Sequence, residues 1–218
     1  MKLSADDTNS ICLGIALIMG LFKYSKVENS YKPFLYYIAV CFLTDMVSIV
    51  LINLYQNNLI AVNITLLLEF ILISYQFKCW GLFNRKPTLF YILNSIVGLS
   101  FITEVIRNGS LWTLYSYTRG VYSFLIVILS IQQLNQLLFK EGKGLFLDSK
   151  FIICNSLIIN YTLLLLVGVF INFNFSASLS FYQKILLLHT PINAFVNVLF
   201  AYAIFKMPER KKFLSIDK

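Results

Sequence analysis

The stretch Leu59–Trp80, LIAVNITLLLEFILISYQFKCW, decides the class of this protein. An α-helix rises about 1.5 Å per residue, so a helix of this length covers a hydrocarbon core of roughly 30 Å. Glu69 lies near the middle of the stretch, between Leu68 and Phe70. A carboxylate at the centre of a spanning helix costs about 2.5–3.5 kcal/mol on insertion, so it usually faces the bundle interior and marks a functional site. The stretch therefore predicts a membrane-spanning helix that carries part of a site.

The composition extends this interpretation to the whole chain. Of the 218 residues, 58% are hydrophobic and only 13% are charged, whereas soluble domains carry about 25% charged residues. The sequence is that of a polytopic membrane protein, and we expect the lipid bilayer to be one of its partners. The formal net charge is +8. On a membrane protein, basic residues mark cytoplasmic loops, so we expect no nucleic-acid partner.

The first hydrophobic run, Ile11–Phe22, is short and resembles the core of a signal peptide. The order of charges around it is the reverse of that in a signal peptide, because Asp6 and Asp7 precede the run while Lys23 and Lys26 follow it. A signal peptide has its basic residues first. The run therefore predicts a first spanning helix, extended back to about residue 8, with its N-terminus outside.

Seven hydrophobic runs predict a single all-α domain over residues 1–218, a bundle of seven transmembrane helices. The expected helices are approximately 8–22, 33–54, 59–80, 87–106, 110–138, 151–172 and 182–205. Fourteen Lys and Arg residues fall in or beside the first, third and fifth loops and the tail; only Lys2, Arg107 and Lys184 fall on the opposite side. The positive-inside rule then predicts an outside N-terminus and a cytoplasmic C-terminus. We expect a multi-pass protein of the cytoplasmic (inner) membrane of a bacterium.

The connections between these helices are too short to hold a soluble domain. The longest cytoplasmic connection, around residues 139–150, has about a dozen residues. A signalling function would therefore need a separate polypeptide for its output. The fifth run ends in SIQQLNQLLFK at residues 130–140, which we expect to emerge as a polar helical extension. That extension is either a solvated helix end or a contact with a partner.

Four of the predicted helices carry polar stripes that can meet only inside the bundle. The spacing of the last stripe is i, i+4, i+8, which is one face of a helix. The candidate residues are Asp45 in the second run, Glu69 in the third, Tyr115, Arg119 and Tyr122 in the fifth, and His189, Asn193 and Asn197 in the seventh.

Arg119 is the strongest member of this cluster, because a guanidinium keeps its proton and needs a carboxylate partner in the membrane. Glu69 or Asp45 can supply one, although Asp45 can instead pair with Ser48. Two interpretations stay open. In the first, the cluster binds a ligand, carries a proton or acts as a gate. In the second, it is a buried ion pair that fixes helix packing. For His189, the alternative is a hydrogen-bonded residue that serves only packing.

Other titratable residues have simpler interpretations. Glu104 and Arg107 are expected to form a surface pair of little energetic value, or the rim of an external opening. The four cysteines, which include Cys41, form no CxxC pair and are interpreted as packing residues. With one histidine, a multi-histidine metal site is excluded. We expect no metal, no cofactor and no catalytic residue.

Four segments resemble a family of small, poorly characterised seven-helix membrane proteins of Bacteroidota. They are LLLEFILISYQF at 66–77, YTRGVYSFLIVILS at 117–130, FIICNSLIINYTLLLL at 151–166 and LLHTPINAFVNVLFAYAIFK at 187–206. The positions that recur in that family match Glu69, Arg119, Asn155, His189 and Asn193. The chain departs from the family after Arg119, where relatives tend to carry a further acidic residue. The resemblance implies a membrane receptor or accessory subunit for a separate sensor histidine kinase.

Four functions are compatible with the sequence. The favoured one is a receptor-like protein whose polar intramembrane site senses a small ligand or the state of the membrane, and passes a signal to a kinase or another membrane protein. The alternative is a small-molecule or proton-coupled transporter that uses Glu69 and Asp45 as proton sites. An enzyme acting on lipid, with His189 and a carboxylate as acid and base, is disfavoured because candidate groups are too few. The fourth is a purely structural subunit.

Overall fold

The protein is a bundle of α-helices in the computed structural model, which describes residues 5–140, 147–172 and 179–210 and the side chains of 9–139, 147–169 and 189–210. The predicted all-α architecture is confirmed within these residues. The helices are α1 (Ala5–Lys23), α2 (Lys32–Tyr55), α3 (Leu59–Cys79), α4 (Pro87–Asn108), α5 (Ser116–Lys140), α6 (Ser149–Asn172) and α7 (Leu179–Lys206), with a short 3-10 turn η1 (Asn29–Tyr31) before α2.

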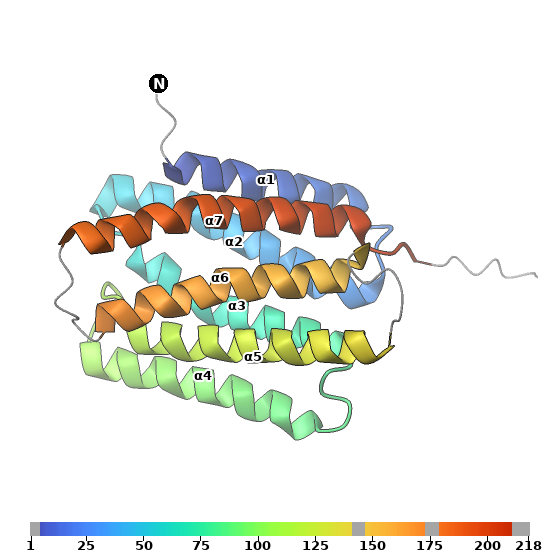
Figure 1. Ribbon diagram of the computed structural model, residues 1–218. Coiled ribbons are helices and arrows are strands. Elements are labelled where there is room, and N and C mark those ends of the chain that lie inside the picture. The colour runs from blue at the N-terminus through green and yellow to red at the C-terminus, as the bar shows by residue number, and fades with distance from the viewer. Residues whose placement is uncertain (1–4, 141–146, 173–178, 211–218) are drawn as a thin grey trace, which may run out of the picture.

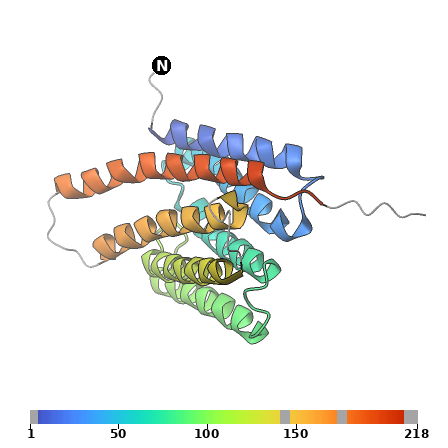
Figure 2. The ribbon, with the colours of Figure 1, turned by 45° about the vertical axis from the view of Figure 1, so that its right-hand side comes forward.

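Consecutive helices run up and down, so that alternate helices begin at the same end of the bundle (Figure 1). The main pairings are α1 with α7, α2 with α3, and α5 with α6, while α6 also packs against α7. The first and last helices thus lie side by side. Helix α4 packs mainly on α3 and α5 and forms one edge of the bundle (Figure 2). The interior is therefore enclosed by the other six helices.

The surface of the bundle is apolar. Helices α2 to α6 are each long and apolar enough to cross a membrane, and α1 contributes a shorter apolar helix from Asn9 to Lys23. Large aliphatic side chains are exposed along α4, among them Ile92, Leu99 and Ile106, the last with 76% of its surface exposed. Lipid tails cover such a surface without cost, whereas water does not. The architecture is that of a multi-pass membrane protein.

The fifth helix begins six residues later than predicted, at Ser116 instead of residue 110. The segment 110–115 forms a loop because its carbonyl oxygens are used elsewhere. The buried Asn63 amide of α3 donates hydrogen bonds to the carbonyls of Leu111 (2.9 Å) and Thr113 (2.7 Å). The other predicted boundaries lie within three residues of the observed ones.

The prediction that Glu104 forms a surface pair with Arg107 was wrong. Glu104 is only 5% exposed. Its carboxylate accepts hydrogen bonds from the backbone N–H groups of Tyr117 (3.0 Å) and Thr118 (2.8 Å), in the first turn of α5. Arg107 instead lies over the ring of Tyr117. Glu104 therefore caps α5, where unpaired N–H groups and the positive end of the helix dipole favour a carboxylate.

Replacing Glu104 by Gln is expected to lower the free energy of unfolding by about 1 kcal/mol, since the amide keeps one acceptor oxygen and turns an NH₂ group toward a backbone donor. Denaturation of the purified protein in detergent measures the loss. Arg107→Gln removes an exposed charge from the same helix end and should have no comparable effect. Equal stability of the two variants would exclude the cap.

At the other end of the bundle, the chain after α7 is tied to the loop after α1. Val27 pairs with Glu209 in a β-bridge, and the Glu28 N–H donates to the Pro208 carbonyl at 3.1 Å. The Lys23 ammonium reaches the Phe205 carbonyl at 2.6 Å. We call residues 205–210 and their partners in residues 23–29 the C-terminal clasp. It fixes the end of α7 against the end of α1 and the loop that leads to α2.

Candidate functional site

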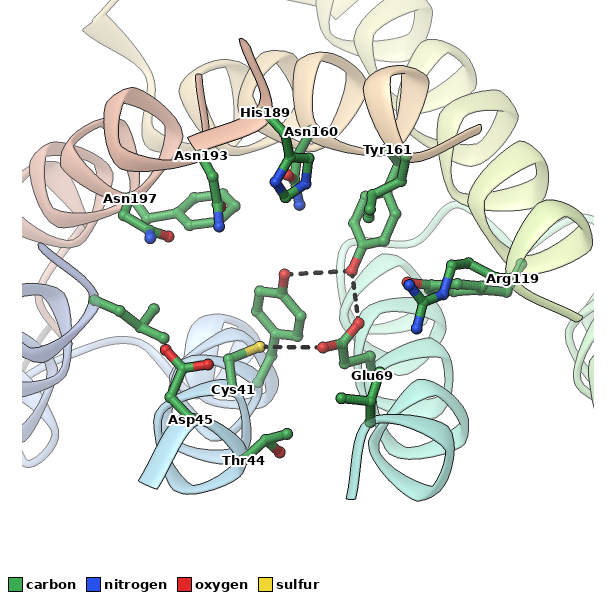
Figure 3. Close-up of a pocket in the computed structure, with 16 residues that line it drawn as sticks. Cys41, Thr44, Asp45, Glu69, Arg119, Asn160, Tyr161, His189, Asn193 and Asn197 are labelled. Carbon is green, nitrogen blue, oxygen red and sulfur yellow. Dashed lines mark hydrogen bonds between the residues drawn. The ribbon is translucent and has the colours of Figure 1, made fainter. Parts of the chain in front are cut away.

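A cavity of about 260 Å³ lies inside the bundle between α1, α2, α3, α5, α6 and α7 (Figure 3). Twelve of its sixteen lining residues have polar side chains. The polar lining residues are Tyr37, Cys41, Thr44, Asp45, Glu69, Arg119, Tyr122, Asn160, Tyr161, His189, Asn193 and Asn197, and the apolar ones are Leu13, Val62, Leu164 and Phe200. We call it the central cavity.

Most of the residues singled out in the sequence meet at the central cavity. The α7 residues His189, Asn193 and Asn197 all line it, as their spacing along one helix face requires. The others that line it are Asp45, Glu69, Arg119 and Tyr122. The polar stripes of α2, α3, α5 and α7 therefore do converge inside the bundle.

Two of the candidate residues lie elsewhere. Tyr115 is fully buried, but its hydroxyl donates to the Ser110 carbonyl at 3.2 Å and its ring packs edge-on against Phe101. Asn155 donates to the Phe151 carbonyl of its own helix at 2.8 Å. Neither side chain lines the central cavity, so both have local structural contacts instead.

Glu69 is held by neutral hydrogen-bond donors from two neighbouring helices (Figure 3). The Tyr161 hydroxyl of α6 donates to Oε2 at 3.1 Å, and the Cys41 thiol of α2 lies 3.5 Å from Oε1. The Tyr37 hydroxyl is 3.3 Å from that of Tyr161, and the Tyr122 ring packs edge-on against the Tyr161 ring. The carboxylate is thus the centre of a network that joins α2, α3 and α6.

The predicted ion pair between Arg119 and Glu69 is not formed among the described residues. Arg119 lines the same cavity from α5 (Figure 3), while both Glu69 oxygens accept bonds from other groups. The late start of α5 explains the difference, because Arg119 lies in the first turn of the helix and not several turns along it. At that depth its long side chain can reach a polar opening, so an intramembrane partner is not required.

Asp45 is linked to α1. The Ser10 hydroxyl donates to Asp45 Oδ2 at 3.2 Å, a contact between helices that neither alternative for Asp45, Arg119 or Ser48, included. On α7, one turn after Asn193, the Asn197 amide donates to the Asn9 carbonyl of α1 at 3.4 Å. These two contacts hold α1 against α2 and α7.

A second cavity of about 320 Å³ continues from the central one. The two share Thr44, Asp45, Val62, His189 and Asn193. The second cavity is further lined by Asn9, Ser10 and Asn58, which lie at or near the first residues of α1 and α3. Polar space therefore leads from Glu69 to the end of the bundle at which α1, α3, α5 and α7 begin.

Toward the opposite end, aromatic rings form the floor of the central cavity. The Phe200 ring packs edge-on against both Phe34 (5.2 Å between centroids) and Tyr37 (6.1 Å). Below them, the buried Gln76 amide accepts from the Phe34 N–H at 2.8 Å and donates to the Ser30 carbonyl at 2.5 Å. The cavity is closed on this side.

Sequence reasoning missed several lining residues, although a signal existed for some. Tyr37, Cys41, Thr44 and Asp45 follow a spacing of four, three and one along α2, so they share the face of Asp45. The interpretation of Cys41 as a packing residue overlooked that face. Tyr161 gave no comparable signal, because a tyrosine in an apolar helix is common and its partner lies 92 residues away.

Among the described residues, no three His, Cys, Asp or Glu side chains are grouped so that they could hold a metal ion. Comparisons of the chain with protein-family models, curated proteins and solved structures found no match. The function is therefore inferred from the geometry of the central cavity and of the two ends of the bundle.

Proposed function

We propose that this protein is a receptor-like membrane protein with seven spanning helices, its N-terminus outside and its C-terminus in the cytoplasm. The central cavity binds a small polar ligand that enters from outside. The resulting change passes to a separate cytoplasmic or membrane partner, such as the histidine kinase that the family resemblance implies. The residues of the binding site are those of the cavity, and Glu69 and Arg119 are its principal charged members.

The observation that carries this proposal is the asymmetry of the cavity. Polar space leads from Glu69 toward the ends of α1 and α3, while the rings of Phe34 and Phe200 close the other side. A site that is open on one side and sealed on the other suits a sensor, which must bind without passing its ligand through. A carrier requires access from both sides in turn.

The closed end of the bundle has the properties of a surface for a partner. Lys23, Lys78 and Lys206 lie in the last turns of α1, α3 and α7. Hollows of about 450 and 390 Å³ lie between the α3–α4 turn and the end of α5; both are lined by Arg85, Gln136 and Phe139. Phe139 is 92% exposed. Positive charge beside an exposed ring fits an acidic segment of a partner protein.

Helix α7 connects the two ends. It carries His189, Asn193 and Asn197 at the cavity, and its last residues enter the C-terminal clasp. A ligand that shifts α7 by a fraction of a turn would change the clasp and the basic surface together. Such a shift is the two-state element that coupling between distant sites requires.

The test of this proposal is purification of the full chain in a mild detergent, with mass spectrometry of the proteins that accompany it. The expected result is a stoichiometric kinase or other signalling protein. Replacement of Arg85 and Phe139 together by Ala should release it, whereas the paired control Arg107→Ala and Ile106→Ala, on the other end of the bundle, should not. A partner held equally by both variants would contradict this docking surface.

The proposed topology makes a separate prediction. A tag placed after Lys218, which lies outside the described residues together with Lys2, Lys143, Lys211 and Lys212, should be detected only after cells are made permeable. The basic residues at the cytoplasmic end determine this orientation. Detection of the tag on intact cells would overturn the orientation or the number of spans.

A transporter is the second candidate. Glu69, Tyr161 and Tyr37 form a chain of hydrogen-bonding groups along the wall of the cavity. Such a chain can carry a proton if the aromatic floor opens. Uptake of a ligand or of protons by vesicles that contain the protein alone, with no partner present, would favour the transporter.

A further inference from the structure

A groove of about 320 Å³ lies on the surface of the bundle, between the end of α1 and the start of α2. Leu35 and Ile38, which line it, are buried, whereas Leu21 beside them is 67% exposed. Gly20 of α1 and Ala39 of α2 contribute little or no side chain, and a Cβ atom at Gly20 would lie 3.2 Å from the Leu35 side chain. We call this hollow the α1–α2 groove.

The α1–α2 groove is apolar along its length and polar at one end. Its only lining side chains with a polar atom are those of Tyr24 and Tyr36. The two hydroxyls are hydrogen-bonded to each other, and the ring centroids lie 6.0 Å apart. Each hydroxyl carries one proton and their mutual bond uses one of the two, so the pair can still donate to an acceptor outside the bundle.

The same end of the groove is positively charged. The Lys32 ammonium, at the first residue of α2, lies 4.8 Å from the centroid of the Tyr24 ring. Residues 23–36 contain three lysines and one acidic residue, Glu28, whose carboxylate accepts from the Ser30 hydroxyl at 2.8 Å. Within the part of the chain that the structure describes, Lys32 has no carboxylate partner. An anion at this end would therefore meet an ammonium and a hydroxyl donor together.

A phospholipid has the same order of apolar and polar parts. The groove follows α1 from Leu17 to Tyr24, which is about 10 Å of helix. Its polar end lies where α1 ends and α2 begins, which is the depth at which tyrosine and lysine meet lipid headgroups. Basic pockets between spanning helices bind anionic headgroups at this depth.

We propose that the α1–α2 groove binds one anionic phospholipid. Lys32 and the hydroxyl pair of Tyr24 and Tyr36 contact its phosphate, and one acyl chain lies along Gly20 and Ala39. The lipid thereby joins α1 to α2. This site is separate from the central cavity, so it does not depend on the ligand or on the partner proposed above.

The experiment is a lipid titration of the purified full chain in detergent, with native mass spectrometry to count the bound lipids. Dioleoyl phosphatidylglycerol and dioleoyl phosphatidylcholine have the same chains and differ in headgroup charge. One phosphatidylglycerol per chain should bind about fivefold more tightly than phosphatidylcholine, which is the contribution of one basic residue near an anionic membrane surface. Equal binding of the two lipids would overturn the inference.

Two further outcomes would assign the groove to another occupant. Glycerol phosphate, which has no acyl chain, should not bind at the concentrations that saturate the lipid site; binding as tight as that of the lipid would identify a free phosphate as the ligand. The same spectra report the number of protein chains. A dimer that Gly20→Leu dissociates would identify the occupant as a second copy of this protein. Either result would contradict a lipid site.

Variants connect the binding to the two parts of the groove. Lys32→Gln should remove the preference for phosphatidylglycerol, whereas Lys86→Gln, an exposed lysine at the same end of the bundle, should preserve it. Gly20→Leu fills the apolar part and should weaken the binding of both lipids. Gly98→Leu is its control, because no atom lies within 4 Å of a Cβ at Gly98.

Lys32→Gln keeps the test decisive if Gly20→Leu does not fold, because Lys32 lies at the end of a helix and its replacement leaves the groove unfilled. A preference for phosphatidylglycerol that persists unchanged in Lys32→Gln would show that the anionic lipid binds elsewhere, and the assignment of the α1–α2 groove would be wrong.

Discussion

Replacing Gln76 by Ala is expected to lower the free energy of unfolding by about 3 kcal/mol. The Gln76 amide is 2% exposed and joins α3 to the start of α2 through the Phe34 N–H and the Ser30 carbonyl. Its loss leaves the buried Phe34 N–H and the half-buried Ser30 carbonyl without this partner, at about 1–3 kcal/mol for each desolvated group. Chemical denaturation in detergent micelles, followed by circular dichroism, measures the change.

Gln132→Ala is the matched control, because Gln132 is an exposed glutamine on a helix of the same bundle. It should change the free energy of unfolding by no more than about 0.5 kcal/mol. The comparison isolates the buried hydrogen bonds from the helix propensity of the substitution. If the two variants unfold at the same denaturant concentration, Gln76 does not fix the closed end of the cavity.

Replacing Arg119 by Leu is expected to abolish ligand binding and output while leaving the fold intact. Removal of one member of a buried charge pair costs about 2–5 kcal/mol of binding energy, which is roughly thirtyfold or more in affinity. Stability should change little, because Arg119 makes no ion pair with Glu69 among the described residues and its hydrogen bond to Tyr115 is between backbone atoms. Signalling output of the proposed partner in cells and the melting temperature of the purified protein test the two halves of this prediction.

Arg107→Leu removes a positive charge from the neighbouring helix end but outside the cavity, so output should be preserved. A stable Arg119→Leu protein with full output would exclude Arg119 from the site. An Arg119→Leu protein that fails to fold would instead support the earlier alternative, in which the polar cluster exists to hold the helices together.

The helices could be predicted because hydrophobic length determines them. Each run of about twenty apolar residues has only one low-energy conformation in a bilayer, in which every backbone group is satisfied within the helix. The stripe of His189, Asn193 and Asn197 could be predicted for a similar reason, since the helical period places them on one face. In the structure these three residues line one cavity, because the helical period places them on one face and α7 packs side by side with α1.

The errors arose where a side chain bonds to the backbone of another segment. The start of α5 is set by Asn63, and its cap is Glu104 from the preceding helix. Neither contact has a periodic signature in the sequence. The depth of Arg119 was misjudged as a result, and with it the ion pair to Glu69. The network around Glu69 was missed because Tyr161 is distant in sequence.

The most direct test of the central claim, that the cavity opens to the outside, is labelling of a cysteine placed at Asn193. In a chain whose four native cysteines are replaced by Ala, Asn193→Cys is treated with a membrane-impermeant thiol reagent added to intact cells. Arg107→Cys and Lys86→Cys, both exposed positions, report the two ends of the bundle. The proposed function predicts that Asn193→Cys reacts from outside, as Arg107→Cys does, while Lys86→Cys reacts only in opened cells. Reaction of Asn193→Cys only in opened cells, together with Lys86→Cys, would contradict an outward-facing site.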